Sequence, residues 1–112
     1  RKLVMALTSS LTPKLEKQLK TLQKKAVNLV TEFETQKEFI LTNTSESSVA
    51  GKSLSGDLQG FRSLDWNYKG VALRICFLYN STDNHIYFVW FGTRENFYGE
   101  TKRYLKSIKR RL

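Results

Sequence analysis

The sequence predicts an α+β fold in which two N-terminal helices pack on a mostly antiparallel sheet of about four strands, followed by a basic C-terminal helix. Two apolar runs, residues 71–79 and 85–91, flank the turn-forming segment 80–84, which is typical of a β-hairpin. An apolar stripe with helical spacing precedes the hairpin, and a second stripe among basic residues follows it. With 112 residues the chain can build one hydrophobic core, so we expect a single domain spanning residues 1–112.

The N-terminal part is predicted to hold the first strand and both helices. Residues 3–7 form a short apolar run that fits a strand. Thr12 and Pro13 mark a helix start, because the threonine can cap free N–H groups and proline is harmless at the first helical position. From there an apolar stripe runs for about five turns, which predicts one core-facing helix face. The stripe consists of Leu15, Leu19, Leu22, Ala26, Leu29 and Phe33. A second helix is expected from about residue 34 to 43.

Residues 42–56 are rich in serine, threonine and glycine, which disfavour a helix, so we expect a mobile loop. The loop contains a Gly-Lys-Ser triplet at residues 51–53. A phosphate-binding loop would also need glycine five residues before Gly51, where this chain has Glu46. The triplet therefore does not predict a nucleotide site.

The remaining elements follow from turn and cap signals. Residues 58–66 are expected to form a strand, and residues 67–70 a turn into the hairpin. After the hairpin, Thr93 would cap a helical turn that Gly99 ends. The tail then forms an amphipathic helix whose apolar stripe lies among lysines and arginines. The stripe consists of Tyr104, Leu105, Ile108 and Leu112.

The hairpin is expected to bring two arginines together at its open end. If Tyr79 pairs near His85, counting back along the antiparallel ladder puts Arg74 opposite about Trp90, close to Arg94. His85 then lies at the closed end, roughly 30 Å from Arg94 along a straight strand at about 3.3 Å per residue.

The charge of the chain indicates a polyanionic partner. Its 19 lysine and arginine residues against 10 aspartate and glutamate residues give a net charge of +9. This favours RNA or an RNA-rich particle over an anionic membrane, with a merely solvated basic surface as the alternative. No apolar run approaches the roughly 18 to 20 residues that a membrane span needs. The one cysteine, Cys76, excludes an internal disulfide, which is typical of the reducing cytoplasm.

Metal and nucleophilic chemistry find little support in the composition. One histidine and one cysteine cannot supply the three or four ligands of a zinc site, so we expect no metal or other cofactor. His85 lies at the closed end of the hairpin, and no base is predicted beside Cys76. What remains is a cationic and aromatic surface. Its residues are Lys52, Arg62, Arg74 and Arg94 with Trp90, Phe97 and Tyr98, extended by Lys102 and Arg103 in the tail.

Such a surface suits a phosphodiester. Arginine forks neutralise phosphate charge, a phenol can move a proton, and bases stack on exposed rings. For Arg74, a structural ion pair with Asp65 or Glu95 explains the residue equally well. The same alternatives stay open for Arg94 and Tyr98. The residues alone therefore predict a basic α/β domain that faces RNA.

Three short motifs in the second half of the chain extend this prediction. Residues 54–60 follow the pattern L-x-G-x-L-x-G, with Arg62 soon after it. Residues 73–77 form a strand segment with arginine in its second position, and the G-x-R of residues 92–94 precedes Tyr98. With the capped lysine-rich helix, these motifs resemble the RelE/ParE superfamily of toxins from bacterial toxin–antitoxin systems.

The resemblance implies a small fold like that of microbial ribonucleases and an acidic antitoxin as partner. For RelE-like members it implies cleavage of mRNA on the ribosome, by metal-independent attack of a ribose 2′-OH on the adjacent phosphate. By motif position, Arg74 would hold the scissile phosphate, Arg94 would be the second arginine, and Tyr98 the general base.

Two departures from the RelE-like pattern keep alternatives open. RelE-like enzymes often carry two lysines before the strand arginine, where this segment offers Arg62, Asp65 and Asn67, and Tyr98 follows Arg94 unusually closely. We therefore expect a ribosome-associated endoribonuclease toxin. A ParE-like gyrase inhibitor without nuclease activity, or a non-catalytic RNA- or ribosome-binding module, is the alternative. For the nuclease, Arg74→Ala should keep the fold and lower activity about 100-fold.

Overall fold

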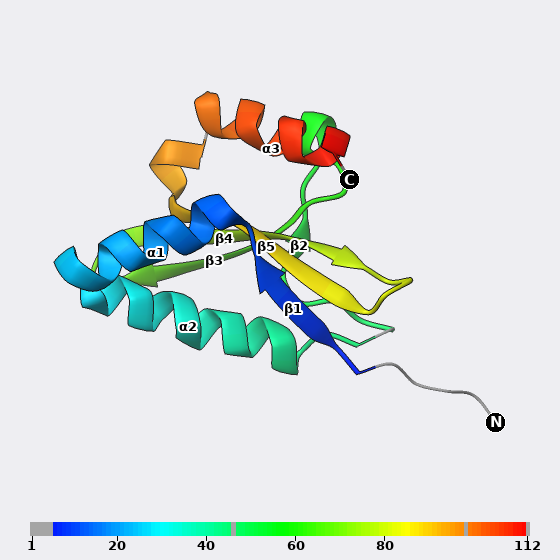
Figure 1. Cartoon of the computed structure of the whole chain (residues 1–112), viewed down its shortest axis with the longest axis horizontal. Coiled ribbons are helices and arrows are strands. Elements are labelled where there is room, and N and C mark those ends of the chain that lie inside the picture. Colours follow the sequence, from blue (N-terminus) through cyan, green and yellow to red (C-terminus); the bar gives the residue numbers. More distant parts are fainter. Residues whose placement is uncertain (1–5, 46, 98, 112) are drawn as a thin grey trace.

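The computed structural model describes residues 6–45, 47–97 and 99–111, and these form one five-stranded sheet with helices on both faces (Figure 1). The strands are β1 (Thr8–Leu11), β2 (Lys52–Ser53), β3 (Arg62–Tyr68), β4 (Val71–Asn80) and β5 (His85–Thr93). The helices are α1 (Pro13–Lys25), α2 (Val27–Thr42) and α3 (Glu100–Arg111), with 3-10 turns η1 (Gly56–Leu58) and η2 (Arg94–Phe97). The predicted α+β class is confirmed, with one strand more than expected.

The sheet has the order β1-β5-β4-β3-β2 and is mostly antiparallel. Strands β3, β4 and β5 follow one another as antiparallel neighbours, and β1 adds to β5 in parallel, with Thr8 beside His85. The first strand was expected over residues 3–7, but Ala6 and Leu7 lie outside it and residues 3–5 lie outside the described part. The observed strand is mostly polar, because it forms a sheet edge, so a search for apolar runs misses it.

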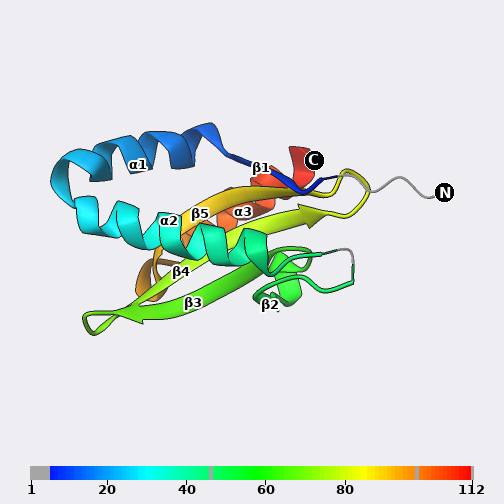
Figure 2. The same ribbon diagram turned by 90° about the horizontal axis from the view of Figure 1, so that it is seen from below.

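The two N-terminal helices form an antiparallel hairpin across one face of the sheet (Figure 2). The predicted start is confirmed, since the Thr12 side chain accepts a hydrogen bond from the Leu15 backbone N–H at 3.2 Å. The prediction of one unbroken helix up to Phe33 is wrong. The chain breaks at Ala26, where φ is −149° and ψ is 63°, so the second helix begins at Val27. Periodicity misses the break because both helices turn their apolar faces to the same sheet.

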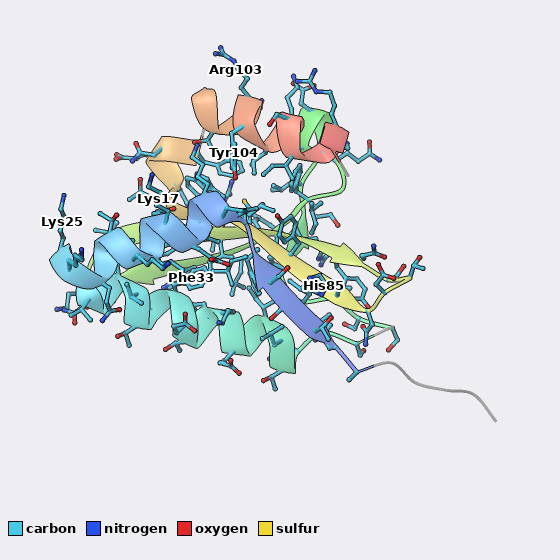
Figure 3. All side chains as sticks on the ribbon, in the orientation of Figure 1. Lys17, Lys25, Phe33, His85, Arg103 and Tyr104 are labelled. Carbon is cyan, nitrogen blue, oxygen red and sulfur yellow. The ribbon has the colours of Figure 1, made fainter. Side chains whose placement is uncertain are left out.

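Two buried clusters lie on opposite faces of the sheet. The larger one packs α1 and α2 on the sheet, and Phe33 points into it from α2 (Figure 3). The ring of Phe33 lies 6.1 Å from that of Phe88 and 5.3 Å from that of Phe91. The second cluster packs α3 and the two 3-10 turns on the other face. Its buried members are Leu58, Phe61, Cys76, Val89, Phe97, Leu105 and Ile108.

The hairpin register differs from the prediction by a bulge. Asn80 pairs with His85 at the closed end, as the turn position predicted to within one residue. The ladder then shifts between Cys76 and Phe77, because β5 carries one extra residue there. Arg74 consequently pairs with Gly92 and not with Trp90.

The remaining elements adjust the predicted boundaries. The strand expected over residues 58–66 is found at 62–68, with Leu58 in η1 instead. The segment 42–56 contributes the two-residue strand β2. The tail forms the predicted amphipathic helix, docked through Leu105 and Ile108. None of the helices in the described ranges is long and apolar enough to cross a membrane.

Candidate anion site around Asp65

Three cations from three different elements converge on the carboxylate of Asp65 in β3. Arg74 in β4 donates from Nε to Oδ1 at 2.7 Å and from Nη2 to Oδ2 at 3.1 Å. Lys52 Nζ, from β2, lies 3.3 Å from Oδ2, and Arg94 Nε, from η2, lies 3.7 Å from the same oxygen. We call these four residues the Asp65 cluster.

Strand pairing builds the cluster. Asp65 and Arg74 are direct cross-strand partners, so their side chains leave the same face of the sheet side by side. Lys52 pairs with Ser63, two residues before Asp65, and therefore reaches the same face. On the other side Arg74 pairs with Gly92, just before η2 begins at Arg94. The cluster therefore lies at the open end of the hairpin, as expected for the two arginines.

Burial separates one inner cation from two outer ones. The side chain of Arg74 is only 7% exposed, and its guanidinium lies 4.5 Å from the centre of the Phe97 ring. The side chains of Lys52 and Arg94 are 62% and 52% exposed. Because a buried charge needs a partner, the Asp65–Arg74 pair is the structural centre of the cluster. Lys52 and Arg94 form its solvent-facing rim.

Asp65 remains ionised at neutral pH. Burial raises the pKa of its carboxyl, but the hydrogen bonds and charges of Arg74 and Lys52 outweigh burial and hold that pKa below its usual 3.8. Three cations against one carboxylate leave two positive charges in excess. Asp65 is thus a weak proton acceptor, and the cluster as a whole attracts anions.

Two pockets flank the cluster. One has a volume of about 510 Å³ and lies at the open end of the hairpin. Its lining residues are Gly70, Val71, Ala72, Thr93, Arg94 and Glu95. The other has a volume of about 230 Å³ and includes Lys52 and Asp65 with Gly51, Ser63 and Leu64. Each outer cation therefore borders space that a small anion or a nucleotide could enter.

Arg62, predicted to bind RNA, binds the neighbouring loop instead of facing the cluster. Its guanidinium donates to the carbonyl oxygens of Val49, Ala50 and Gly51 and to the hydroxyl of Ser53, at 2.8 to 3.0 Å. These bonds use four of its five N–H donors. They fix the segment that carries Lys52. No sequence pattern signals this, because every partner but one is a backbone carbonyl.

Gly51, like the hydrogen bonds of Arg62, helps to position Lys52. Its φ of +77° favours glycine, and a Cβ there would clash with the Ser63 carbonyl oxygen and meet the Phe77 ring at 3.4 Å. The backbone therefore approaches β3 more closely than any larger residue allows. The sequence signals only the Gly-Lys-Ser triplet at Gly51, because a close approach between two backbones leaves no sequence pattern.

The predicted aromatic surface is largely covered. Phe97 is 2% exposed and packs edge-on against Trp90, with ring centres 5.1 Å apart. Trp90 is partly buried. A base could not stack on Phe97 without displacing its neighbours. Tyr98, the predicted general base, lies outside the described residues.

None of the described basic residues of α3 forms an ion pair with Asp65. Arg103 is exposed and points into solvent, while Tyr104 points towards α1, where Lys14 Nζ lies 4.1 Å from its ring centre (Figure 3). Lys102 is partly exposed on the same helix. On the η1 side, Lys106 pairs with Asp57 at 3.6 Å.

His85 sits at the closed end of the hairpin, as predicted. Its two ring nitrogens lie 2.6 Å from the Thr8 hydroxyl and 2.8 Å from the Ser10 hydroxyl, so the ring links the edge strand β1 to β5. Within the described ranges, no group of three or more His, Cys, Asp and Glu side chains is arranged to hold a metal ion.

Comparison with known proteins identifies the family. A search of curated proteins and a search of solved structures found no match. The family model for the ParE-like toxin of type II bacterial toxin–antitoxin systems matches residues 9–102, which include β2 to β5, all of β1 except Thr8, and the whole Asp65 cluster. The chain therefore belongs to the ParE-like toxin family of type II bacterial toxin–antitoxin systems.

Proposed function

We propose that this toxin is an endoribonuclease that cleaves mRNA on the ribosome and that the Asp65 cluster receives the RNA phosphate. One observation carries the proposal. The Asp65–Arg74 pair already neutralises itself, yet Lys52 and Arg94 reach the same carboxylate from two further elements and remain more than half exposed. A structural ion pair has no need of two additional cations, whereas a phosphate site does.

In this mechanism the cluster binds and stabilises charge, and a second group moves the proton. The ribose 2′-OH attacks the adjacent phosphorus, the 5′-oxygen of the next nucleotide leaves, and a 2′,3′-cyclic phosphate forms. Lys52 and Arg94 would contact the phosphate oxygens, whose negative charge grows in the transition state. Arg74 would fix the geometry through Asp65. Tyr98 is the proposed acceptor of the 2′-OH proton, by its motif position.

Membership of a type II toxin–antitoxin family implies an antitoxin partner. We propose that the antitoxin is acidic in the segment that covers Lys52 and Arg94, because it must neutralise the same positive charge as the target. The net charge of +9 on the toxin also favours a negatively charged antitoxin.

Gyrase inhibition is the second candidate, and one observation favours it. Arg74, which motif position assigns to the scissile phosphate, is 7% exposed and bound by Asp65 through both carboxylate oxygens. A toxin that acts by binding a protein target needs no free phosphate-binding arginine. In that case the Asp65 cluster would serve as a docking surface.

A paired assay separates the two candidates. Purified toxin is added to translating ribosomes with mapping of mRNA ends, and in parallel to DNA gyrase in a supercoiling assay. We expect cleavage on the ribosome, reduced about 100-fold by Arg94→Ala and less strongly by Lys52→Ala. Lys106→Ala is the matched control, because it removes one exposed cation whose ion-pair partner is Asp57 and not Asp65. Intact mRNA together with inhibited supercoiling would establish the gyrase candidate instead.

A further inference from the structure

One carboxylate oxygen of Asp65, Oδ2, lies close to three cations. This oxygen lies 3.1 Å from Arg74 Nη2, 3.3 Å from Lys52 Nζ and 3.7 Å from Arg94 Nε. The Lys52 and Arg94 contacts are longer than usual N–H···O hydrogen bonds, so these two cations meet the oxygen only as ion pairs. The two longer contacts belong to the two exposed residues. An anion with more oxygen atoms would serve Lys52 and Arg94 better than Asp65 does.

We propose that Asp65 acts as a built-in competitor for the phosphate site: its carboxylate holds Lys52 and Arg94 until a phosphate group replaces it as their partner, while Arg74 stays bound to Asp65. The inference rests on the proposed function for the identity of the ligand, a phosphodiester. Inorganic phosphate carries the same chemistry and serves as the probe.

Exposure determines which cations can change partner. Lys52 and Arg94 have long side chains that are 62% and 52% exposed, so both can turn from Asp65 to a ligand in the flanking pockets. Arg74 is packed against Phe97 and cannot follow them. The exchange therefore involves only the two outer contacts.

The carboxylate has two opposing effects on anion binding. It keeps three like charges together, which would otherwise repel one another, and so preserves the shape of the site. Its own negative charge also repels an incoming phosphate. Asp65 is therefore a positioning residue that lowers affinity for the ligand while the site waits for it.

The inference predicts that removing the carboxylate charge tightens phosphate binding. We would titrate the full chain with inorganic phosphate at constant ionic strength and follow amide chemical shifts to obtain Kd. Asp65→Asn should lower Kd about fivefold or more, the scale of removing one charge about 4 Å away in a water-like dielectric. Lys52→Ala and Arg94→Ala should each raise Kd.

The matched control separates this effect from overall charge. Asp57→Asn makes the same change in net charge. Asp57, however, is an exposed residue of η1, and its ion-pair partner is Lys106 of α3. Its Kd should stay close to that of the parent. If Asp65→Asn and Asp57→Asn change Kd equally, or if Asp65→Asn weakens binding, Asp65 is not a competitor.

A second variant covers the case in which Asp65→Asn does not fold, since it leaves Arg74 buried without a counter-charge. Asp65→Asn combined with Arg74→Met removes the pair as a unit at unchanged net charge, and it frees Lys52 and Arg94 from the carboxylate. We expect a lower Kd for phosphate than in the parent. An unchanged or higher Kd in this folded variant would overturn the inference.

The ribosome assay keeps the two proposals distinguishable. Tighter phosphate binding by the Asp65 variants without any mRNA cleavage by the parent toxin would remove the nuclease proposal and leave the anion site. If the parent toxin cleaves mRNA but the Asp65 variants bind phosphate with the same Kd as the parent, the nuclease proposal stands and only the inference about Asp65 fails.

Discussion

Arg74 illustrates what a single residue in a sequence does and does not reveal. Its place in an apolar strand signals an unusual role, and the sequence leaves two explanations open, a phosphate contact and an ion pair with Asp65 or Glu95. The structure contains the ion pair with Asp65. Arg74→Ala would remove the closest partner of the partly buried Asp65 carboxylate, so we expect this variant to lose stability as well as activity. Lys52 and Arg94 are the better residues for activity tests.

The ionisation of Asp65 gives the toxin a specific sensitivity to acid. Since the folded-state pKa of Asp65 lies below its usual 3.8, the charged carboxylate stabilises the fold fully above that pH, and this contribution is lost as the pH falls further. We expect the free energy of unfolding, measured by urea titration with circular dichroism, to fall more steeply below pH 3.8 in the parent than in the Asp65→Asn, Arg74→Met double variant. Identical slopes would mean that the pair contributes no pH-dependent stability.

The placement of Lys52 beside Asp65 could not be predicted from the sequence. The sequence placed Lys52 in a mobile loop, where it had the weakest case for function. A two-residue strand carries no periodic signal, and the contacts that hold it are made by Arg62 and by the backbone at Gly51. Only the folded structure brings this lysine beside Asp65.

At the level of helices and strands, the sequence predicted which side of a helix faces the core better than it predicted where the helix begins and ends. The α1–α2 stripe faces the core as expected, with Leu15 and Phe33 buried, yet the helix ends at Lys25 and restarts at Val27. Helical spacing shows which side chains share one side of a helix. It does not show whether the helix continues or ends and a second, antiparallel helix begins. The tail, by contrast, was predicted correctly as an amphipathic helix, and the structure shows that it is docked through Leu105 and Ile108 rather than frayed.

Helix α3 controls access to the one cysteine. Cys76 is fully buried in the cluster that α3 covers, and burial, opposed by the smaller effect of the Arg74 charge, raises the pKa of its thiol to about 12. We expect the native thiol to resist a disulfide-exchange reagent at neutral pH. Leu105→Ala should speed labelling, because the lost packing costs about 2 to 5 kcal/mol and loosens α3.

Lys106→Ala is the control for this experiment, since Lys106 lies on the exposed side of the same helix. Its labelling rate should equal that of the parent. If Leu105→Ala labels no faster than Lys106→Ala, the thiol becomes accessible only through unfolding of the sheet and not through movement of α3.

For the whole molecule, the sequence predicted the class of fold, the antiparallel core of the sheet and the helices on it. It missed β2 and misplaced β1, and both are edge strands whose pairing depends on the neighbouring strand rather than on their own apolar pattern. The family resemblance covered roughly residues 12–100, and the family model matches residues 9–102. The finer choice between RNA and gyrase depends on chemistry that a fold does not determine.

The net charge of +9 leads to a prediction for the intact toxin. Because each phosphate contact releases counterions, binding to ribosomes or RNA should weaken steeply with salt, by about 10³-fold between 50 and 200 mM for a handful of contacts. Filter binding across that range would measure the slope. Arg94→Ala and Lys52→Ala should each lower the slope by about one. An affinity that does not change with salt would contradict a polyanionic target.

The bulge in β5 also has a consequence for anyone who aligns relatives of this chain. Phe88 and Phe91 both enter the core beneath α2, although a spacing of three places residues on opposite faces of a regular strand. The unpaired Val89 between them restores the match. A relative one residue shorter here would need no bulge, because a spacing of two keeps both aromatic rings on one face and the G-x-R segment in the same register. An alignment of relatives should therefore allow a one-residue gap between the two aromatic positions, since the Asp65 cluster can be kept with the bulge or without it.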